Sequence, residues 1–396
     1  MQPTFHIASP SSSSQLHSLT EIFAKTFSAY WERVDYVLDG YIPHSNYDWN
    51  ASRVGLIDGE VATHFGVWDF GMRIGSAVAR VAGIGAVATL KTHRGHGLMA
   101  KTAGACVEGL GDAGYDMTLL FGIPNFYHRF GYVVTFTENQ FLLSTRDLPA
   151  PSQDVVIEPF TGDVKVLAQV YNRENEGITG TYVRPTYGSN RRPGTDRIYT
   201  IPSGYVVVAR DADTLEVVDC AGDPAEVVAA IRKLASAEVT PRIRFTFLPR
   251  RSRVGEYLQT VSHTFQAEHK PTGGPMIKIV NLHSLFEKLS GEMSRRLKAS
   301  PLSGYDGSLV LEGDGETVVL EIAGGTVHKV RPGSSDAVDA SGTVSAGAGL
   351  ARLVLGDTEP ARICRQEGIT TTGDAVHLVP ILFPDQEPST ILWDRF

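Results

Sequence analysis

The hydrophobic and polar positions along the chain divide it into three blocks, each with its own run of strands and helices. The blocks meet at two linker-like segments, LPAPSQD and PTGGP. A chain of 396 residues holds two or three domains at roughly 150 residues each. We therefore expect three domains, over residues 1–148, 149–273 and 274–396.

In the first block the pattern predicts an α/β crossover unit. After a short strand and a helix with apolar residues at helical spacing, the run VGLIDGEVATHFGVW predicts a hairpin around Asp58 and Gly59. VAGIGAVATL and YDMTLLFGI read as buried strands, and the segment between them predicts a helix that ends at Gly111. Strand, loop, helix and strand in this order are typical of an α/β fold.

The second block repeats this order. GYVVVARD and LEVVDC predict a hairpin across Ala212 to Thr214, and RIRFTFL predicts a further strand. Between them, AEVVAAIRKL predicts a helix with Asp223 as N-cap and Pro224 at its first position. The repetition predicts two similar α/β domains in tandem.

The third block has a different pattern, which is typical of an α+β module. LHSLFEKLSGEMSRRL predicts a helix, and SLVLEGDGETVVLEI predicts a hairpin around Gly313 to Gly315. GAGLARLVLG is helix-like, and AVHLVPILF reads as a late apolar strand. This block has no obvious polar catalytic cluster, so we expect the chemistry to lie elsewhere.

Composition and charge narrow the choice of partners. A formal net charge of −8 argues against nucleic acid or an anionic membrane as a partner, so an anionic ligand needs a local binding device. Three cysteines, far apart in the chain, imply neither a disulfide framework nor a metal cluster. The segment MQPTFHIASPSSSSQ lacks the features of a signal peptide, and no apolar run approaches roughly 18 residues. We expect a cytoplasmic protein.

A loop at the N-terminus of a helix is one local structure that can bind an anion. The string R-x-x-G occurs at Arg80–Gly83, Arg94–Gly97, Arg191–Gly194 and Arg365–Gly368. A pyrophosphate needs the N–H groups and the positive dipole of a helix start. The segment from Arg80 leads into a strand, whereas Arg94 to Leu98 leaves a buried strand and opens an amphipathic helix. The sequence therefore predicts a phosphate site at Arg94–Gly97.

Two motifs on either side of this helix resemble the GNAT superfamily of acetyltransferases. They are AVATLKTHRGHGLM, before the helix, and FGIPNFYHRFGY, after the next strand. More narrowly, essentially the whole chain resembles the enhanced intracellular survival family of aminoglycoside acetyltransferases. This resemblance implies a catalytic GNAT domain, a degenerate GNAT-like domain and a sterol-carrier-protein-like α+β domain whose end reaches the active site. Met99 departs from the small residue that usually ends the GNAT loop pattern.

The resemblance implies acetyl-CoA as the cosubstrate and no metal. The positions that it assigns to acetyl-CoA are Val87, Ala88, Thr89, Arg94, Gly95, His96, Gly97, Leu98, Met99, Ala100, Gly122 and Ile123. In the second block the corresponding joint, VDCAGDPAEV, carries Asp219 and Asp223 where a phosphate would bind. Two carboxylates at a helix start would repel a pyrophosphate, so we expect that copy to bind no coenzyme.

The implied reaction moves an acetyl group to a primary amine of an aminoglycoside-like molecule, a polyamine or a lysine. Backbone N–H groups of Val87 to Thr89 could face the thioester carbonyl and stabilise the developing oxyanion. By the resemblance, Tyr127, and not Tyr132, protonates the leaving thiolate, and a packing role is the alternative for Tyr127. The base implied by the resemblance is the terminal carboxylate of Phe396, and the alternative is a frayed or merely packed end.

For further residues near the site, the sequence allows two interpretations, a functional role or a structural one. His93, His96 and His128 flank it and could act as bases near neutral pH, or could pack or face solvent. Aromatic and acidic residues of the first helix could bind a cationic amine, or could pack in a helix core. These residues are Phe27, Tyr30, Trp31 and Glu32. Arg395 replaces the acidic penultimate residue associated with aminoglycoside acetylation, which argues against polycationic substrates.

Functions from three classes fit the sequence. The first is an acetyl-CoA-dependent N-acetyltransferase that acts on a small-molecule or peptide amine. The second is a carrier of a lipid or another hydrophobic ligand in the third block, and the third is a CoA-binding sensor without turnover. The family resemblance also implies a closed symmetric homo-oligomer, a hexamer.

Overall fold

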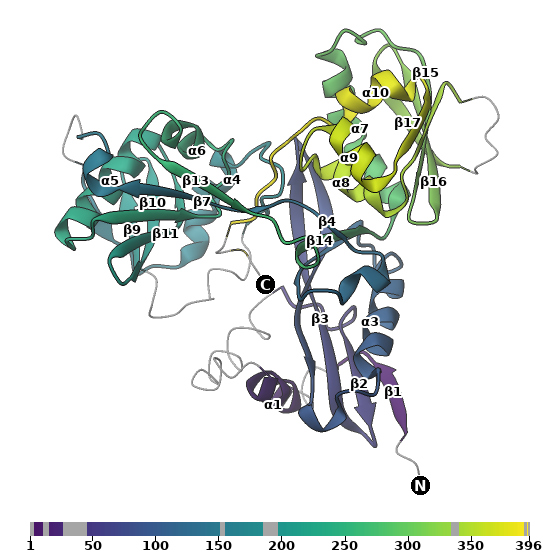
Figure 1. Ribbon diagram of the computed structural model, residues 1–396, viewed down its shortest axis with the longest axis horizontal. Helices are drawn as coiled ribbons and strands as arrows, with labels where there is room; N and C mark the ends of the chain where they lie inside the picture. Colours follow the sequence, from purple (N-terminus) through teal and green to yellow (C-terminus); the bar gives the residue numbers. More distant parts are fainter. Residues whose placement is uncertain are drawn as a thin grey trace.

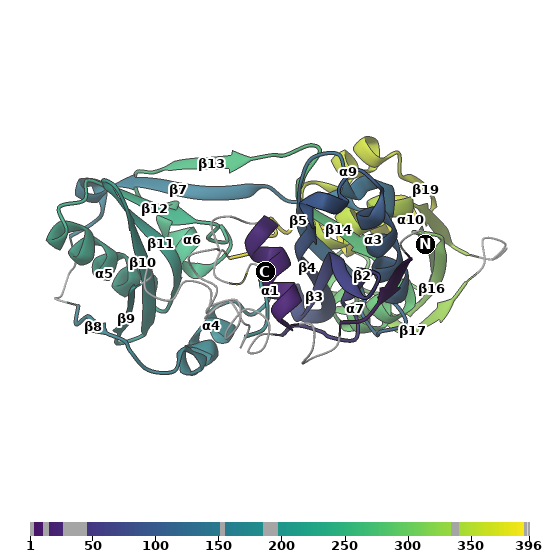
Figure 2. The same ribbon diagram turned by 90° about the horizontal axis from the view of Figure 1, so that it is seen from below.

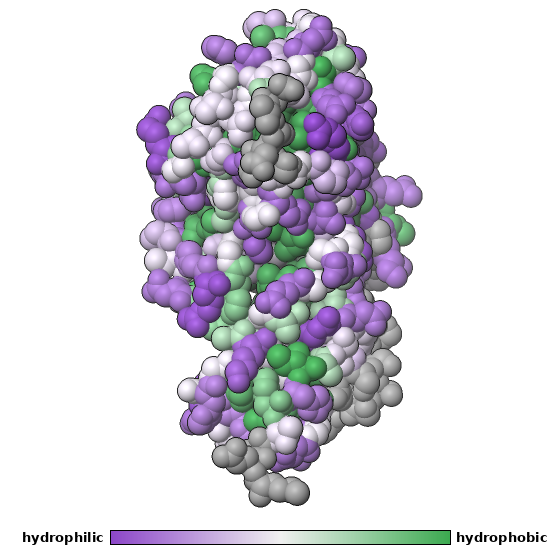
Figure 3. Space-filling view, turned by 90° about the vertical axis from the view of Figure 1, so that its right-hand side faces the viewer, coloured by the Kyte–Doolittle hydropathy of each residue, from purple (hydrophilic) through white to green (hydrophobic). Residues whose placement is uncertain are grey.

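The chain folds into three units, each built on its own β-sheet (Figure 1). The computed structural model describes residues 4–10, 16–26, 46–150, 155–184, 197–333, 340–391 and 394. No helix in these ranges is long and apolar enough to cross a membrane. On the face shown in Figure 3, hydrophilic and hydrophobic side chains are interspersed.

The first unit contains a seven-stranded sheet in the order β1-β2-β3-β4-β5-β14-β6. Its strands are β1 (Phe5–Ala8), β2 (Arg53–Ile57), β3 (Glu60–Ile74), β4 (Ala77–Thr89), β5 (Met117–Gly122), β6 (Val133–Val134) and β14 (Gly274–Ile279). The helical segments among its described residues are α1 (Leu16–Thr26), α3 (Leu98–Gly109), η3 (Lys91–His93) and η4 (Tyr127–Phe130). β4 and β5 run parallel, and their neighbours pair antiparallel.

The second unit has the same sheet topology, in the order β13-β7-β12-β11-β10-β9-β8. Its strands are β7 (Glu138–Ser144), β8 (Glu158–Pro159), β9 (Arg197–Ile201), β10 (Gly204–Asp211), β11 (Thr214–Ala221), β12 (Arg242–Thr246) and β13 (Thr264–Glu268). Its helical segments are η5 (Thr145–Asp147), η6 (Val164–Leu167), α4 (Ala168–Glu174), α5 (Pro224–Ala237) and α6 (Arg253–Leu258). The parallel pair β11 and β12 corresponds to β4 and β5. The duplicated α/β pattern predicted from the sequence is confirmed.

Two strands pair outside the block in which the sequence places them. β14, within the predicted range 274–396, inserts between β5 and β6 of the first unit. β7, within the predicted range 1–148, inserts between β12 and β13 of the second unit, and Figure 2 shows β7 and β13 side by side. Local sequence patterns identify a strand but not its partners, because pairing is decided by long-range packing.

The third unit contains a five-stranded sheet in the order β17-β16-β15-β18-β19. Its strands are β15 (Gly307–Gly313), β16 (Glu316–Ala323), β17 (Thr326–Pro332), β18 (Gly342–Ser345) and β19 (Thr370–Gly373). Its helical segments are α7 (Leu282–Lys298), η8 (Gly347–Gly349), α8 (Leu350–Leu355), α9 (Pro360–Glu367) and α10 (Ala375–Leu382).

The strand predicted at AVHLVPILF is wrong, because this segment forms α10. Its buried residues, Ala375, Leu378, Val379 and Leu382, follow helical spacing. Pro380 lies inside the helix, where it lacks the N–H that would bond to the carbonyl of Val376. A short apolar run does not distinguish a buried strand from a buried helix.

Local signals in the first two units are confirmed. Asp58 and Gly59 join β2 to β3 with φ angles of 52° and 90°, as a tight hairpin turn requires. Asp223 caps α5 by accepting hydrogen bonds from two backbone N–H groups, with Pro224 in the first turn. These turns and caps set the ends of the elements that carry the candidate site.

The first and third units share one hydrophobic core. Phe286 and Leu289 of α7 belong to the same buried cluster as Trp68 and Phe70 of β3, and α7 also contacts β4. The second unit packs its own cluster around α5. The strand that leads to the predicted phosphate site is therefore supported by the third unit.

Candidate active site

The loop from β4 to α3 forms an open helix start. Gly95 and Gly97 adopt left-handed φ angles of 82° and 70°, and an ideal Cβ at either position would meet nothing within 4 Å. No side chain caps α3 at Gly97. The first N–H groups of an α-helix lack partners within the helix, so this end offers backbone donors and a positive dipole to an anion.

Arg94 lies on this exposed loop, and its Nε donates a hydrogen bond to the Thr89 carbonyl at 3.1 Å. Arg80, the competing match to the loop pattern, lies within β4 and has structural partners. Its guanidinium pairs with Asp69 at 2.8 Å and lies 4.2 Å from the Tyr115 ring centroid. Arg80 therefore has a structural role within the sheet, whereas Arg94 lies at the start of α3; the assignment of the phosphate site to Arg94–Gly97 stays a prediction.

β4 and β5 diverge next to this loop. Their parallel pairing ends at Ile84 and Leu120, although β4 continues to Thr89. The Leu90 N–H donates to the Ala62 carbonyl of β3. Because N–H directions alternate along a strand, the N–H groups of Val87 and Thr89 face the side from which β5 has departed.

Tyr127 lies beside this opening, in η4, and is 6% exposed. It belongs to the same hydrophobic cluster as Met99 of α3 and Val87 of β4. Gly122 makes room for it, because a Cβ there would lie 2.6 Å from the Tyr127 ring. Burial raises the pKa of Tyr127 to about 12, so its hydroxyl keeps its proton at neutral pH.

The structure thus brings most of the sequence-predicted positions to one place. Around α3, Leu98, Met99 and Ala100 form its first turn, and His96 is exposed on the loop. Ala88 is buried in β4, and Ile123 is 63% exposed beyond β5.

Several predicted residues lie outside the described residues. They are Phe27, Tyr30, Trp31, Glu32, Trp393, Arg395 and Phe396. The assignments of an amine pocket and of a terminal base therefore stay predictions.

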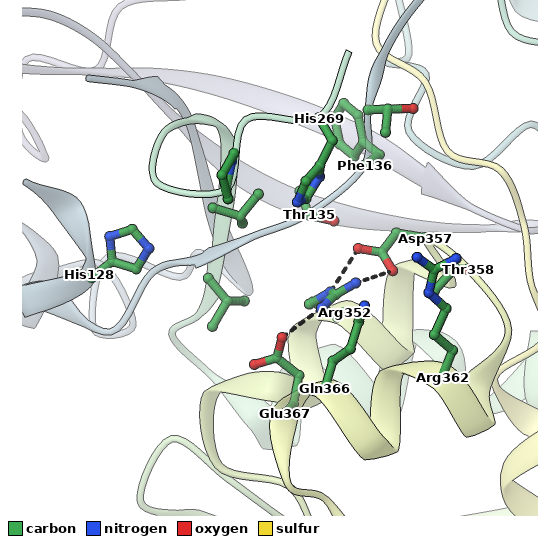
Figure 4. Close-up of a pocket in the computed structure, with 14 residues that line it drawn as sticks. His128, Thr135, Phe136, His269, Arg352, Asp357, Thr358, Arg362, Gln366 and Glu367 are labelled. Atoms are coloured by element: carbon green, nitrogen blue, oxygen red, sulfur yellow. Dashed lines mark hydrogen bonds and ion pairs between the residues drawn. The ribbon is translucent and has the colours of Figure 1, made fainter. Parts of the chain in front are cut away.

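His128 faces a different space, a cavity of about 560 Å³ between η4, β6 and the third unit. Figure 4 shows Arg352 of α8 between two carboxylates, with His128 on the far side of the cavity. Arg352 pairs with Asp357 at 2.8 Å and with Glu367 at 2.6 Å. Because its charge is neutralised, Arg352 does not make this cavity an anion site.

His64, a fully buried residue of β3, was not predicted from the sequence. Its Nδ1 lies 2.9 Å from the Ala86 carbonyl oxygen of β4, and its Nε2 lies 2.7 Å from the Tyr47 hydroxyl. Burial lowers its pKa to about 4. No local signal marks His64, because its importance comes from the irregular pairing of β3 with β4.

The second unit closes the corresponding opening. The β11 and β12 pairing also stops early, at Val217 and Phe245, but the Asp223 side chain occupies the start of α5. Asp219 is buried and pairs with Arg184 at 2.6 Å. The two carboxylates thus have structural partners at the place where the first unit offers an open helix start.

The C-terminal segment passes from the third unit into the second. Ile391 is 3% exposed and packs in a cluster of the second unit, and Thr390 Oγ1 donates to the Gly180 carbonyl. Asp394 is 1% exposed, and both of its oxygens accept hydrogen bonds from Arg184. Ile391 and Asp394 are therefore both anchored in the second unit.

Comparisons with known proteins agree with this architecture. Residues 12–135 match the family model described as an acetyltransferase (GNAT) domain. No curated protein sequence matches the chain.

Solved structures resemble the chain along its whole length. A GCN5-related N-acetyltransferase from Kribbella flavida has a TM-score of 0.73 and 18% identity, over 100% of this chain and 99% of that one. Another, from Anabaena variabilis, has a TM-score of 0.75 and 18% identity, over 98% and 99%. Eis1 from Mycobacterium abscessus has a TM-score of 0.67 and 14% identity, over 99% and 100%. At these identities the likeness shows a common fold.

Proposed function

We propose that the protein is an acetyl-CoA-dependent N-acetyltransferase acting on a primary amine, since residues 12–135 match the model of a GNAT acetyltransferase domain. The observation that carries the proposal is the open start of α3 beside the divergence of β4 from β5, with Tyr127 at its edge. Aminoglycoside-like molecules, polyamines and lysine side chains are the amines to test.

The chain's own residues fit a bound acetyl-CoA, which supplies the acetyl group as a thioester. Gly95 and Gly97 would let the pyrophosphate approach the backbone, since their Cβ positions point into open space. The α3 dipole and the Arg94 guanidinium would compensate its negative charge. The N–H groups of Val87 and Thr89 would face the arm that carries the thioester.

In the transfer, the amine nitrogen forms a bond to the acetyl carbon, and the carbon–sulfur bond breaks. The protonated amine loses one proton to a base before it attacks and a second one, to water, as the amide forms, and the departing sulfur gains one from the Tyr127 hydroxyl. The products are the N-acetyl amine and the CoA thiol, after which the base releases its proton to water and Tyr127 regains one. An amine with a pKa near 10.4 is almost wholly protonated at pH 7, so a base is needed.

We assign the base to the terminal carboxylate of Phe396. Support comes from the anchoring of the preceding segment, because Ile391 and Asp394 are buried in the second unit. A carboxyl with an ordinary pKa near 3.5 is a weak base, so the proposal requires burial or a cationic partner around it.

Calorimetric titration with acetyl-CoA tests the proposed binding site. Gly97→Glu would place a carboxylate against the pyrophosphate, and we expect it to weaken binding at least tenfold. Gly177→Glu is the matched control, since Gly177 also has a left-handed φ, of 76°, and an open Cβ position, in the second unit. Equal affinities for the two variants would refute the Arg94–Gly97 site.

The two other functions make different predictions. A lipid carrier would need a cavity in the third unit, but Leu309 and Leu311 of β15 and Leu320 of β16 belong to the packed core shared with the first unit. A CoA-binding sensor would bind acetyl-CoA in the titration and would release no thiol in the presence of amines.

A further inference from the structure

A β-bulge interrupts β4 where it parts from β5. On β3, His64 pairs with Ala88 and Gly66 pairs with Gly85, so Ala86 and Val87 together oppose one residue. Ala86 has a φ of 48°, a left-handed conformation that is unfavourable for a residue with a side chain. Such conformations persist where the surroundings hold them, and they cluster at functional sites.

His64 is the group that holds this bulge. A carbonyl oxygen accepts hydrogen bonds, so the contact between His64 Nδ1 and the Ala86 oxygen, at 2.9 Å, places the ring proton on Nδ1. Nε2 then accepts from the Tyr47 hydroxyl at 2.7 Å. Full burial lowers the pKa of His64 to about 4, so the ring stays neutral and keeps this arrangement at neutral pH.

The surrounding residues fix the ring in place. A Cβ at position 66 would lie 2.6 Å from the His64 ring, so only glycine leaves room for the histidine there. The Phe23 ring of α1 meets the His64 ring edge to face, with 4.8 Å between the centroids. The Tyr47 ring lies nearly parallel to the His64 ring, with 5.9 Å between the centroids. The histidine therefore has little freedom to move away from the bulge.

The carbonyl that His64 holds belongs to the same peptide group as the Val87 N–H. A trans peptide is planar, and its C=O and N–H point in opposite directions. A donor on the Ala86 oxygen therefore fixes the direction of the Val87 N–H and polarises it, because linked hydrogen bonds strengthen one another. This N–H faces the opening between β4 and β5.

We propose that His64 and Tyr47 are positioning residues that orient and polarise the Val87 N–H toward the thioester carbonyl of acetyl-CoA. This inference rests on the proposed function. Negative charge develops on that oxygen during acetyl transfer, and preorganised donors stabilise it most effectively. Neither side chain touches the substrate; both act through one peptide group.

The test is the carbonyl stretch of acetyl-CoA labelled with carbon-13 at the acetyl carbonyl, measured by infrared difference spectroscopy on the full chain. A hydrogen bond to the carbonyl lowers its frequency, so the wild-type complex should show a lower stretch than free acetyl-CoA. His64→Leu should lose most of this shift. His64→Asn, whose amide can donate from near the Nδ1 position, should keep most of it.

Turnover and affinity give a second readout. His64→Leu should lower kcat about ten- to hundredfold, less than or equal to the loss of an entire oxyanion donor. Its affinity for CoA, which has no acetyl group, should stay within about twofold of wild type. Val61→Ala, a buried substitution elsewhere on β3, controls for general loss of packing and should leave the carbonyl stretch unchanged.

The outcomes separate this inference from the proposed function. If the wild type binds no acetyl-CoA, the proposed function fails and this inference fails with it. If acetyl-CoA binds but His64→Leu keeps the full shift, the positioning role alone is refuted. If His64→Leu does not fold, Tyr47→Phe decides, since losing one hydroxyl should reduce the shift in part and an unchanged shift would overturn the proposal.

Discussion

At the scale of single residues, burial determines what Tyr127 can contribute. With its pKa raised to about 12 by burial, the phenol is a poorer acid than a thiol, whose pKa is near 8.5. It is therefore suited to donating a hydrogen bond to the leaving sulfur and to passing its proton only as charge develops there. The same pKa means that Tyr127 stays protonated throughout the range in which the protein would be assayed.

We expect Tyr127→Phe to lower kcat about tenfold or more, up to the roughly 10²–10⁴-fold that is typical of an acid–base group, with acetyl-CoA affinity unchanged. The wild-type pH–rate profile should show no loss of activity from Tyr127 ionisation below about pH 11. Tyr132→Phe is the control, because the Tyr132 hydroxyl is buried against Thr118 Oγ1 at 2.9 Å. It should cost stability and spare kcat; the opposite pattern would exchange the roles of the two tyrosines.

The buried His64 should make the stability of the folded protein depend on pH. Its pKa is about 4 in the folded protein and near 6.5 when unfolded, so between these values the unfolded chain binds a proton that the folded chain does not. Stability is therefore full above about pH 6.5 and falls as pH drops toward 4, by roughly 3 kcal/mol. Urea unfolding at pH 7 and pH 4.5 should show a smaller loss for His64→Asn than for wild type; equal losses would contradict the prediction.

The sequence predicted some site residues and missed others for a physical reason. Arg94 and Arg80 carry the same motif, and the choice between them needed only the order of strand and helix. His64 acts through a bulge that exists because β3 and β4 are out of register, and a single sequence does not reveal register. Its polar partners, Tyr47 and Ala86, are likewise joined to it only by folding.

At the scale of elements, the C-terminal segment is held by a buried cluster of ions. Arg184 contacts Asp394 at 2.8 Å and Asp219 at 2.6 Å, and it lies 3.5 Å from the Tyr171 ring centroid. One cation thus serves two carboxylates from segments far apart in the chain. Removing the cation is more harmful than removing one carboxylate, because it leaves buried charges uncompensated.

We expect Arg184→Met to destabilise the fold by about 3–5 kcal/mol. Asp394→Asn keeps the ion pair between Arg184 and Asp219 and should cost about 1–3 kcal/mol. Urea unfolding measures both. If Asp394→Asn costs as much as Arg184→Met, the cluster does not depend on Arg184 in the way the contacts indicate.

A related prediction concerns Phe396. Adding one residue after it converts its carboxylate to an amide, so acetyl transfer should fall steeply while acetyl-CoA binding and thermal stability barely change. Phe396→Leu keeps the carboxylate and should be much milder. An extended chain with wild-type turnover would return the base to His93, His128 or a water molecule.

Elements differ in how far the sequence predicted them. Turns and caps are local, so the Asp58–Gly59 hairpin and the Asp223 cap were predictable from a few residues. α10 was predicted as a strand, because a short apolar run does not distinguish a buried strand from a buried helix. The pairing of β7 in the second sheet and of β14 in the first sheet was not predictable, since each has a normal strand pattern and its partners lie far along the chain.

At the scale of the whole molecule, β7 and β14 connect the units, because each pairs in the sheet of a unit other than the one predicted from its sequence position. β14 joins β5 to β6 of the first sheet, and its residues Met276 and Ile277 are fully buried. A chain of residues 1–148 would lack this strand and would leave the backbone N–H and C=O groups along this edge of β5 unpaired. The predicted hexamer and the sterol-carrier likeness of the third unit stay predictions at this scale.

We expect the isolated 1–148 chain to show no cooperative unfolding transition by circular dichroism, since the gap lies inside its sheet. The full chain, under the same conditions, should unfold cooperatively. A sharp transition in the fragment would mean that the first unit is stable without β14 and that the pairing of β14 in its sheet adds little to its stability.

The measurement that tests the central claim most directly is acetylation of an amine by the purified protein. Acetyl-CoA is incubated with a panel of aminoglycosides, polyamines and lysine peptides, while thiol release is followed and the amine is weighed by mass spectrometry. The account predicts thiol release together with the added mass of one acetyl group on at least one amine, lost in Gly97→Glu and kept in Gly177→Glu. Tight binding of acetyl-CoA with no acetylated amine in any class would contradict it.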